Sequence, residues 1–197
     1  MGQIDKFRAA MSKAKGFARP AKFKIRLHPP GNLLPEFRRD VELFCNAVQM
    51  PGHDLQAQTQ QHGSAPGRQI VQSHDFAGTI DATFYLDSHM RERHFFEMWQ
   101  KMAVNTNTHK ANYYDDYIGS MQIFQLDSQG EITYGIKATE VYPETIGGIE
   151  YSYDSANQIA TQAISFEYRQ WYNMTADTIA SYKGSNLFEL ELKRYGY

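Results

Sequence analysis

The sequence predicts a mainly β fold, an antiparallel two-sheet sandwich or barrel with one flanking α-helix, plus a short N-terminal helix and a C-terminal extension. Many short segments alternate apolar and polar side chains, and turn-forming residues separate them at short intervals. In addition, 14% of the residues are aromatic, a composition that favours strands. The 197 residues are enough to close one hydrophobic core. We therefore expect one domain over residues 1–173 and an extension over residues 174–197.

The N-terminal region is predicted to form a helix and then a basic strand. Apolar side chains recur at helical spacing over residues 4–15 and Gly16 ends the pattern, which predicts a helix within residues 1–16. Over residues 22–27 the apolar side chains alternate with Lys and Arg, the pattern of a half-exposed strand. The basic face of that strand must meet water or acidic groups.

Four elements are predicted in the middle of the chain. A second strand is expected at Val41–Val48, and residues 53–68, rich in Gln, Gly and Pro, are expected to form a long extended loop or a loosely paired hairpin that a neighbour could order. Residues 79–86 alternate most clearly and predict a strand. A helix follows, with Asp87 or Ser88 as its N-cap. Its apolar stripe, which we expect to cover one side of a sheet, comprises Phe95, Met98, Trp99 and Met102.

Further strands are predicted in the C-terminal half. Residues 117–126 and 131–141 are expected to pair as a hairpin whose turn places Gly130 at positive φ. Two more strands are expected beyond Pro143, at Ile149–Tyr153 and Ile159–Trp171. The extension is expected to hold a short helix near residues 175–182 and an edge strand around residues 188–192.

Charge is distributed unevenly along the chain. Residues 1–40 contain ten Lys or Arg against three Asp or Glu, a net of +7, whereas the remaining residues contain ten against nineteen, a net of −9. This asymmetry indicates either a basic end that meets an acidic surface on another copy or partner, or a solvated basic terminus. Nucleic-acid binding is less favoured, because apolar residues interrupt the basic ones. The candidate inter-subunit contacts are Lys6, Arg8, Lys13, Lys15, Arg19, Lys22, Lys24 and Arg26.

No catalytic, cofactor-binding or metal site is predicted. The sequence contains no HExxH, CxxC, Walker or GxSxG motif. His89 and His94 are five residues apart on the predicted helix, so they point about 140° apart and do not easily share an ion. Cys45 lies in an apolar run, where a thiol is expected to be a buried structural group. We therefore expect a protein that is not an enzyme and has no cofactor; a metal-dependent hydrolase is the disfavoured alternative.

The stretch from Tyr142 to Ile159 is the most distinctive part of the sequence. An aromatic-Pro segment leads through two glycines to a strand, an Asp-Ser-Ala-Asn turn and a long closing strand. Three further landmarks occur in order, namely Phe17–Pro20, Cys45–Gly52 and Phe96–Trp99. Together they cover about residues 17–173 and resemble the T4-type contractile bacteriophage tail tube proteins.

The resemblance implies a tail-tube-like β-barrel that forms hexameric rings, which stack into the inner tube of a contractile tail and conduct DNA without specific binding. Its implied partners are further copies of the chain, the sheath protein, the baseplate tube initiator and a tape measure protein in the lumen. No membrane partner is expected, because no apolar stretch is long enough for a signal peptide or a membrane span. The expected location is the host cytoplasm during assembly and then the virion tail. A baseplate tube initiator and a type VI secretion tube protein are the alternatives.

Overall fold

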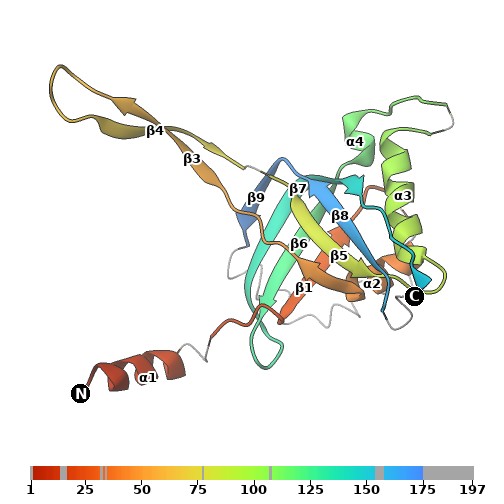
Figure 1. Cartoon of the computed structure of the whole chain (residues 1–197), viewed down its shortest axis with the longest axis horizontal. Helices are drawn as coiled ribbons and strands as arrows, with labels where there is room; N and C mark the ends of the chain where they lie inside the picture. The colour runs from red at the N-terminus through yellow and green to blue at the C-terminus, as the bar shows by residue number, and fades with distance from the viewer. Residues whose placement is uncertain are drawn as a thin grey trace. The chain divides into compact units, whose positions relative to one another are not determined.

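The computed structural model describes residues 2–13, 17–31, 33, 35–76, 78–106, 108–153 and 158–174, and it is mainly β (Figure 1). Its helices are α1 (Gln3–Lys13), α2 (Pro35–Leu43), α3 (Arg91–Ala103) and α4 (Tyr114–Tyr117). Its strands are β1 (Phe23–His28), β2 (Cys45–Val48), β3 (Asp54–Gln60), β4 (Arg68–Asp75), β5 (Ile80–Tyr85), β6 (Gly119–Leu126), β7 (Ile132–Ile146), β8 (Thr161–Glu167) and β9 (Gln170–Asn173). The mainly β class predicted from sequence is confirmed.

Seven strands form one sheet in the order β1-β6-β7-β8-β5-β2, with β9 also paired to β7, while β3 and β4 form a separate two-stranded sheet. The pairs β2–β5, β5–β8, β7–β8 and β3–β4 are antiparallel, as predicted. By compactness the chain divides into a first unit (residues 1–26, 122–137 and 172–197) and a second unit (residues 27–121 and 138–171). Whether residues 174–197 form an extension stays a prediction, because residues 175–197 lie outside the described part.

The first unit contains α1, most of β1 and residues 122–137, which are the turn-proximal part of the predicted β6–β7 hairpin. Gly130 adopts a φ of 86° in the connecting turn, as predicted. The carboxylate of Asp127 accepts hydrogen bonds from the N–H groups of Gln129 and Glu131 at 2.8 and 2.9 Å, which closes that turn. Buried apolar side chains on all three strands form the core of this unit: Ile25, Ile123, Phe124 and Ile136.

The second unit is built on the packing of α3 against β5 and β8. The ring of Phe96 lies 4.9 Å from that of Phe84 on β5 and 5.7 Å from that of Phe166 on β8, and all three are fully buried. Trp99 is buried beside them and donates a hydrogen bond from Nε1 to the carbonyl of Tyr117 at 2.8 Å. The predicted stripe is confirmed for Phe95 and Trp99, whereas Met98 and Met102 are only half-buried. Sequence reasoning missed Phe96 as the central contact.

The start of α3 depends on Asp87, although the N-cap position itself is Met90. The carboxylate of Asp87 accepts hydrogen bonds from the backbone N–H of Arg91 and of His89, each at 3.0 Å. The bond from Arg91 satisfies one of the donors that the first helical turn leaves unpaired, and the bond from His89 fixes the turn before the helix. They also hold the pKa of Asp87 at about 2, with the Arg91 N–H bond as the largest cause. The N-cap predicted at Asp87 or Ser88 is therefore wrong, because the cap position is Met90 and Asp87 reaches the first helical turn from three residues before it.

The strand predicted at Val41–Val48 is wrong over its first half. Residues 41–43 belong to α2, and only Cys45–Val48 pair as β2. Two sequence signals indicated the helix: Pro35 suits the first helical position, and apolar side chains at Phe37, Val41 and Phe44 follow helical spacing. The helix brings the carboxylate of Glu42 to the backbone N–H of Leu27, which donates to it at 2.8 Å.

The strand boundaries at the C-terminal end also differ from the prediction. β7 continues to Ile146, and residues 149–153 are not a strand, with Tyr151 and Tyr153 largely exposed. The pairing of β7 with β8 ends where the N–H of Gly147 donates to the carbonyl of Ala163 at 2.9 Å. Residues 149–153 therefore lie beyond the paired part of the two strands. The single strand predicted at Ile159–Trp171 is two strands, because the chain turns after Glu167 and β9 then pairs with β7.

The segment predicted as a loop or loosely paired hairpin is a regular antiparallel hairpin that extends to Asp75. Its register shifts once, between Gln56 and Ala57. The helix predicted near residues 175–182 and the strand around residues 188–192 lie outside the described residues.

Gly119 marks the closest backbone approach in the second unit, and its replacement tests the packing. A Cβ at Gly119 would fall on the carbonyl oxygen of His28 and lie 2.8 Å from Trp99 Cζ2. Because neither neighbour has room to move, we expect G119A to lower the free energy of unfolding by about 3 kcal/mol in a denaturant titration. The control is G148A, where no atom lies within 4 Å of the added Cβ. Equal stability of the two variants would contradict the packing described above.

Candidate interaction surfaces

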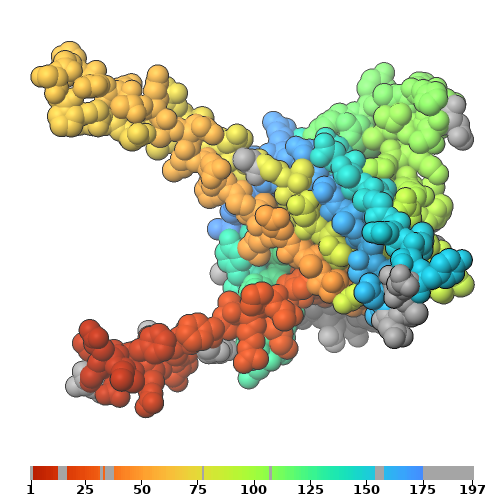
Figure 2. Space-filling view, in the orientation of Figure 1, coloured from red at the N-terminus to blue at the C-terminus, as the bar shows by residue number. Residues whose placement is uncertain are grey.

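The β3–β4 hairpin is exposed at every residue of both strands, and it extends away from β5 and β8 of the same unit (Figures 1 and 2). Its cross-strand contacts include a 3.2 Å hydrogen bond from Gln69 Nε2 to Thr59 Oγ1. Leu55, Ile70 and Val71 on the hairpin are 61%, 44% and 54% exposed. Val71 pairs with Ala57, two residues from Leu55, so Leu55 and Val71 lie on one face of the ribbon and Ile70 lies on the other. A two-stranded ribbon is marginal in water without a packed face, so the face that carries Leu55 and Val71 is suited to burial by another molecule.

A second surface is the face of β5 and β8 opposite α3, which we call the free face. Alternation along the strands directs Asp81, Thr83 and Tyr85 of β5 away from the helix. They pair with Ser165, Ala163 and Thr161 of β8, and Ser165 Oγ donates to Asp81 Oδ1 at 2.6 Å. Neither strand contains Lys or Arg, and the ionisable acids on this face of β5 and β8 are Asp81 and Glu167. On these two strands the free face is therefore mostly polar and carries acidic side chains without basic ones.

A third feature is an ion pair at the bend between β8 and β9. Glu140 of β7 has a φ of 55°, unusual for a residue with a side chain. Its carboxylate accepts hydrogen bonds from Arg169 Nη1 at 2.7 Å and from the Tyr114 hydroxyl at 3.0 Å. The Arg169 bond lowers the pKa of Glu140, while burial and then the bond to Glu140 raise the pKa of Tyr114 to about 12. The three groups tie α4, β7 and the bend together.

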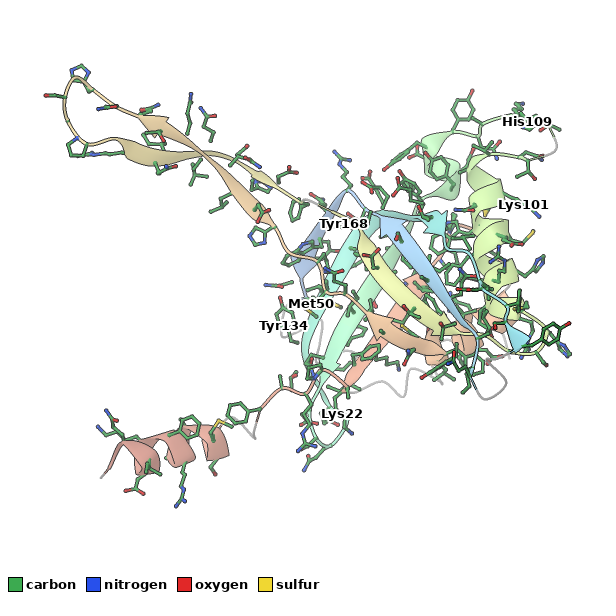
Figure 3. The ribbon with its side chains drawn as sticks, in the orientation of Figure 1. Lys22, Met50, Lys101, His109, Tyr134 and Tyr168 are labelled. Atoms are coloured by element: carbon green, nitrogen blue, oxygen red, sulfur yellow. The ribbon has the colours of Figure 1, made fainter. Side chains whose placement is uncertain are left out.

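The predicted basic contacts lie on two separate elements of the first unit. Lys6 and Arg8 are exposed on α1, and Lys24 is exposed on β1, where Arg26 is half-buried. Arg19 and Lys22 precede β1, and their backbone carbonyls accept hydrogen bonds from Gln125 Nε2 at 3.0 and 2.8 Å, beside the β6–β7 turn (Figure 3). The side chain of Lys13 and all of Lys15 lie outside the described residues. Their role as inter-subunit contacts stays a prediction.

The groups considered for chemistry are dispersed. Within the described part of the chain, no three His, Cys, Asp or Glu side chains are grouped closely enough to hold a metal ion. Burial raises the pKa of the Cys45 thiol to about 12, which keeps it protonated and unreactive. Among these residues, no helix has both the length and the apolar character needed to cross a membrane.

A loosely paired hairpin is one of the two alternatives that the sequence predicts for residues 53–68, but its regular pairing as far as Asp75 is not predicted, because residues 54–60 alternate weakly. The ion pair of Glu140 is not predicted at all. Glu140 and Arg169 are 29 residues apart, so no local pattern predicts their contact. The predicted strand at residues 79–86 indicates which β5 side chains lie on the free face. Which β8 side chains lie beside them is known only from the observed β5–β8 register.

Comparison with known proteins identifies the fold. The family model described as "Phage tail tube protein" matches residues 18–174. The anti-feeding prophage tube terminating cap resembles the chain with a TM-score of 0.60 and 12% identity, over 81% of this chain and 92% of its own. A chain of the PVC sheath-tube complex, from an extracellular contractile injection system, resembles it with a TM-score of 0.58 and 10% identity, over 85% of this chain and 97% of its own. No curated protein matches the sequence.

The Glu140 ion pair predicts a pH dependence of stability. A carboxylate with a lowered pKa adds stability that is present above its unfolded-state pKa and is lost as the pH falls through the lower folded-state value. We therefore expect acidification below the ordinary value of 4.5 to lower the melting temperature of the wild type more than that of E140Q. E144Q, at an exposed carboxylate of the same strand, is the control. Parallel melting curves for wild type and E140Q down to pH 3 would refute the ion pair's contribution.

Proposed function

Because this chain belongs to the phage tail tube protein family, we propose that it is a structural subunit of the inner tube of a contractile tail. Copies of the chain form hexameric rings, and the rings stack into a hollow cylinder that conducts DNA during ejection. The observation that carries the proposal is the family match over residues 18–174, which contains every strand of the described fold. The role requires binding surfaces and no catalytic group.

A stacked tube needs contacts that close into a ring in one direction and repeat in the other. We assign one of them to the β3–β4 hairpin. The apolar side chains of Leu55 and Val71, on one face of the ribbon, leave water only when another molecule covers them. A neighbouring copy is the partner that a homopolymer supplies at high local concentration.

The free face of β5 and β8 is assigned to the lumen. A lumen that conducts DNA must not hold phosphate groups, and binding to phosphates depends on Lys and Arg. The free face has neither on these strands, and the carboxylates of Asp81 and Glu167 repel phosphate. DNA and, before it, a tape measure protein then pass without specific binding.

The basic N-terminal segment is assigned to an adjacent subunit or ring. Lys6, Arg8 and Lys24 are exposed, and the rest of the chain carries the opposite net charge. Complementary charge gives such a contact its orientation and speeds association. The sheath protein and the baseplate tube initiator are the further partners, bound on the outside and at the tube's end.

A baseplate tube initiator is the second candidate, supported by the likeness to a chain of the anti-feeding prophage baseplate with a TM-score of 0.55 and 9% identity. An initiator forms single rings on which a different protein polymerises, whereas a tube protein adds to itself. Extended tubes grown from the purified chain alone would exclude the initiator role. A type VI secretion tube protein is the remaining structural alternative.

Negative-stain microscopy of the purified protein tests the proposed function. We expect six-membered rings or tubes from the wild type, and L55D is expected to require at least about tenfold higher concentration, because it places a charge in the hairpin contact. Q56D, on the other face of β3, is the matched control. Since both positions are exposed, the unfolding free energy of each variant should stay within about 0.5 kcal/mol of wild type. A monodisperse wild-type monomer under all conditions would contradict the proposal.

Deletion of residues 1–16 tests the N-terminal assignment. We expect the deletion variant to form rings that stack more weakly than those of the wild type. The difference in stacking between the two proteins should shrink at high salt, because salt screens the charge contact that the wild type makes and the variant lacks. The double variant K6E/R8E, at two exposed positions of α1, should weaken stacking in the same direction without shortening the chain. Unchanged tube length in both variants, measured by microscopy, would show the assignment to be wrong.

A further inference from the structure

We propose that Trp171 is the positioning residue of the β3–β4 hairpin. It contacts both chain segments at the hairpin root and so fixes the direction in which the hairpin leaves its unit. The inference rests on the proposed function, since it gives the hairpin's direction a role in meeting a neighbouring copy. The residue itself lies in β9, which pairs with β7.

One side chain contacts the two ends of the hairpin. Trp171 Nε1 donates a hydrogen bond to the carbonyl of Gly52 at 3.0 Å, two residues before β3 begins. Its ring centroid lies 5.4 Å from that of His53, which directly precedes β3. It also lies 6.1 Å from the ring of Phe76, which directly follows β4. The incoming and outgoing segments are thus held to one point.

The rings at the root contact one another as well. His53 lies 6.1 Å from Phe76, and His74 lies 5.3 Å from Phe76 with an interplanar angle of 88°. Edge-to-face geometry is one of the arrangements that aromatic quadrupoles favour, and the His74–Phe76 pair adopts it. Pro51 is buried one residue before Gly52, which anchors the entry segment further. The root is therefore an ordered cluster, which we call the root cluster, of His53, His74, Phe76 and Trp171.

The hairpin has little other support from its own unit, because all residues of β3 and β4 are exposed. At about 3.4 Å per residue, the seven residues of β3 extend about 24 Å from the root. A rotation of about 10° at the root moves the tip by about 4 Å, more than a hydrogen bond or an apolar contact tolerates. If the root is fixed before assembly, the hairpin loses less conformational entropy when it contacts a neighbouring copy, and binding is more favourable.

A purely space-filling role for Trp171 makes a different prediction. Its replacement would then lower the unfolding temperature but leave the hairpin's direction unchanged. W171F retains most of the ring and loses the donor to Gly52, whereas W171A loses both. Tyr172→Ala removes a neighbouring, 46% exposed aromatic side chain of the same strand and is the matched control.

Double electron–electron resonance measures the hairpin's direction directly. Spin labels are placed at Ser64, in the hairpin turn, and at Asp115, exposed on α4, in full-length protein carrying C45S. Both sites lie in the second unit.

We expect a narrow distance distribution for the wild type and the Y172A control, at least a twofold broader one for W171A, and an intermediate width for W171F. If W171A does not fold, W171F alone decides. Widths equal to wild type in the folded variants would overturn the proposal.

Assembly is then measured on the same variants without labels. We expect the concentration at which rings or tubes appear to rise at least tenfold for W171A and not for Y172A. A broadened distribution with unchanged assembly would overturn the functional part of the inference. Failure of the wild type to assemble would overturn the proposed function instead, and the distance distributions would still test the root cluster.

Discussion

The packing of α3 against β5 and β8 is the contact on which the second unit depends. Because the ring of Phe96 lies between Phe84 and Phe166, the inward positions of both strands belong to the core. Strand alternation then directs Thr83 and Ala163 to the opposite face, where they pair across the two strands. One covered face and one free face follow from this single contact, and it is the free face that we propose as the lining of the lumen.

The hairpin that we propose as an assembly surface is exposed in the monomer, and contacts at its root support it. The hairpin leaves Leu55 and Val71 in water, a cost that burial by a second copy removes. Its direction is set at the root by Trp171, and the nearby bend between β8 and β9 is fixed by the ion pair of Glu140 with Arg169. Rigid attachment of an exposed arm favours binding, since less motion is lost when a contact forms.

The sequence predicts elements whose contacts are local. The alternation over residues 79–86 and the Phe95–Trp99 spacing lead to β5 and α3 because helix and strand periods are visible within a few residues. The apolar run at Val41–Val48 misled because part of it also fits a helix that starts at Pro35. The contact at the hairpin root escaped prediction for another reason: Trp171 and Gly52 are 119 residues apart, and only the folded register brings them together. Family resemblance over residues 17–173 supplied what periodicity alone did not.

Cryo-electron microscopy of tubes grown from the wild-type chain tests the central claim most directly. The account predicts a six-membered ring in which Asp81, Thr83 and Ala163 line the lumen and the β3–β4 hairpin is covered by another copy. A tube whose lumen is lined by α3, or in which the free face is buried between subunits, would contradict it.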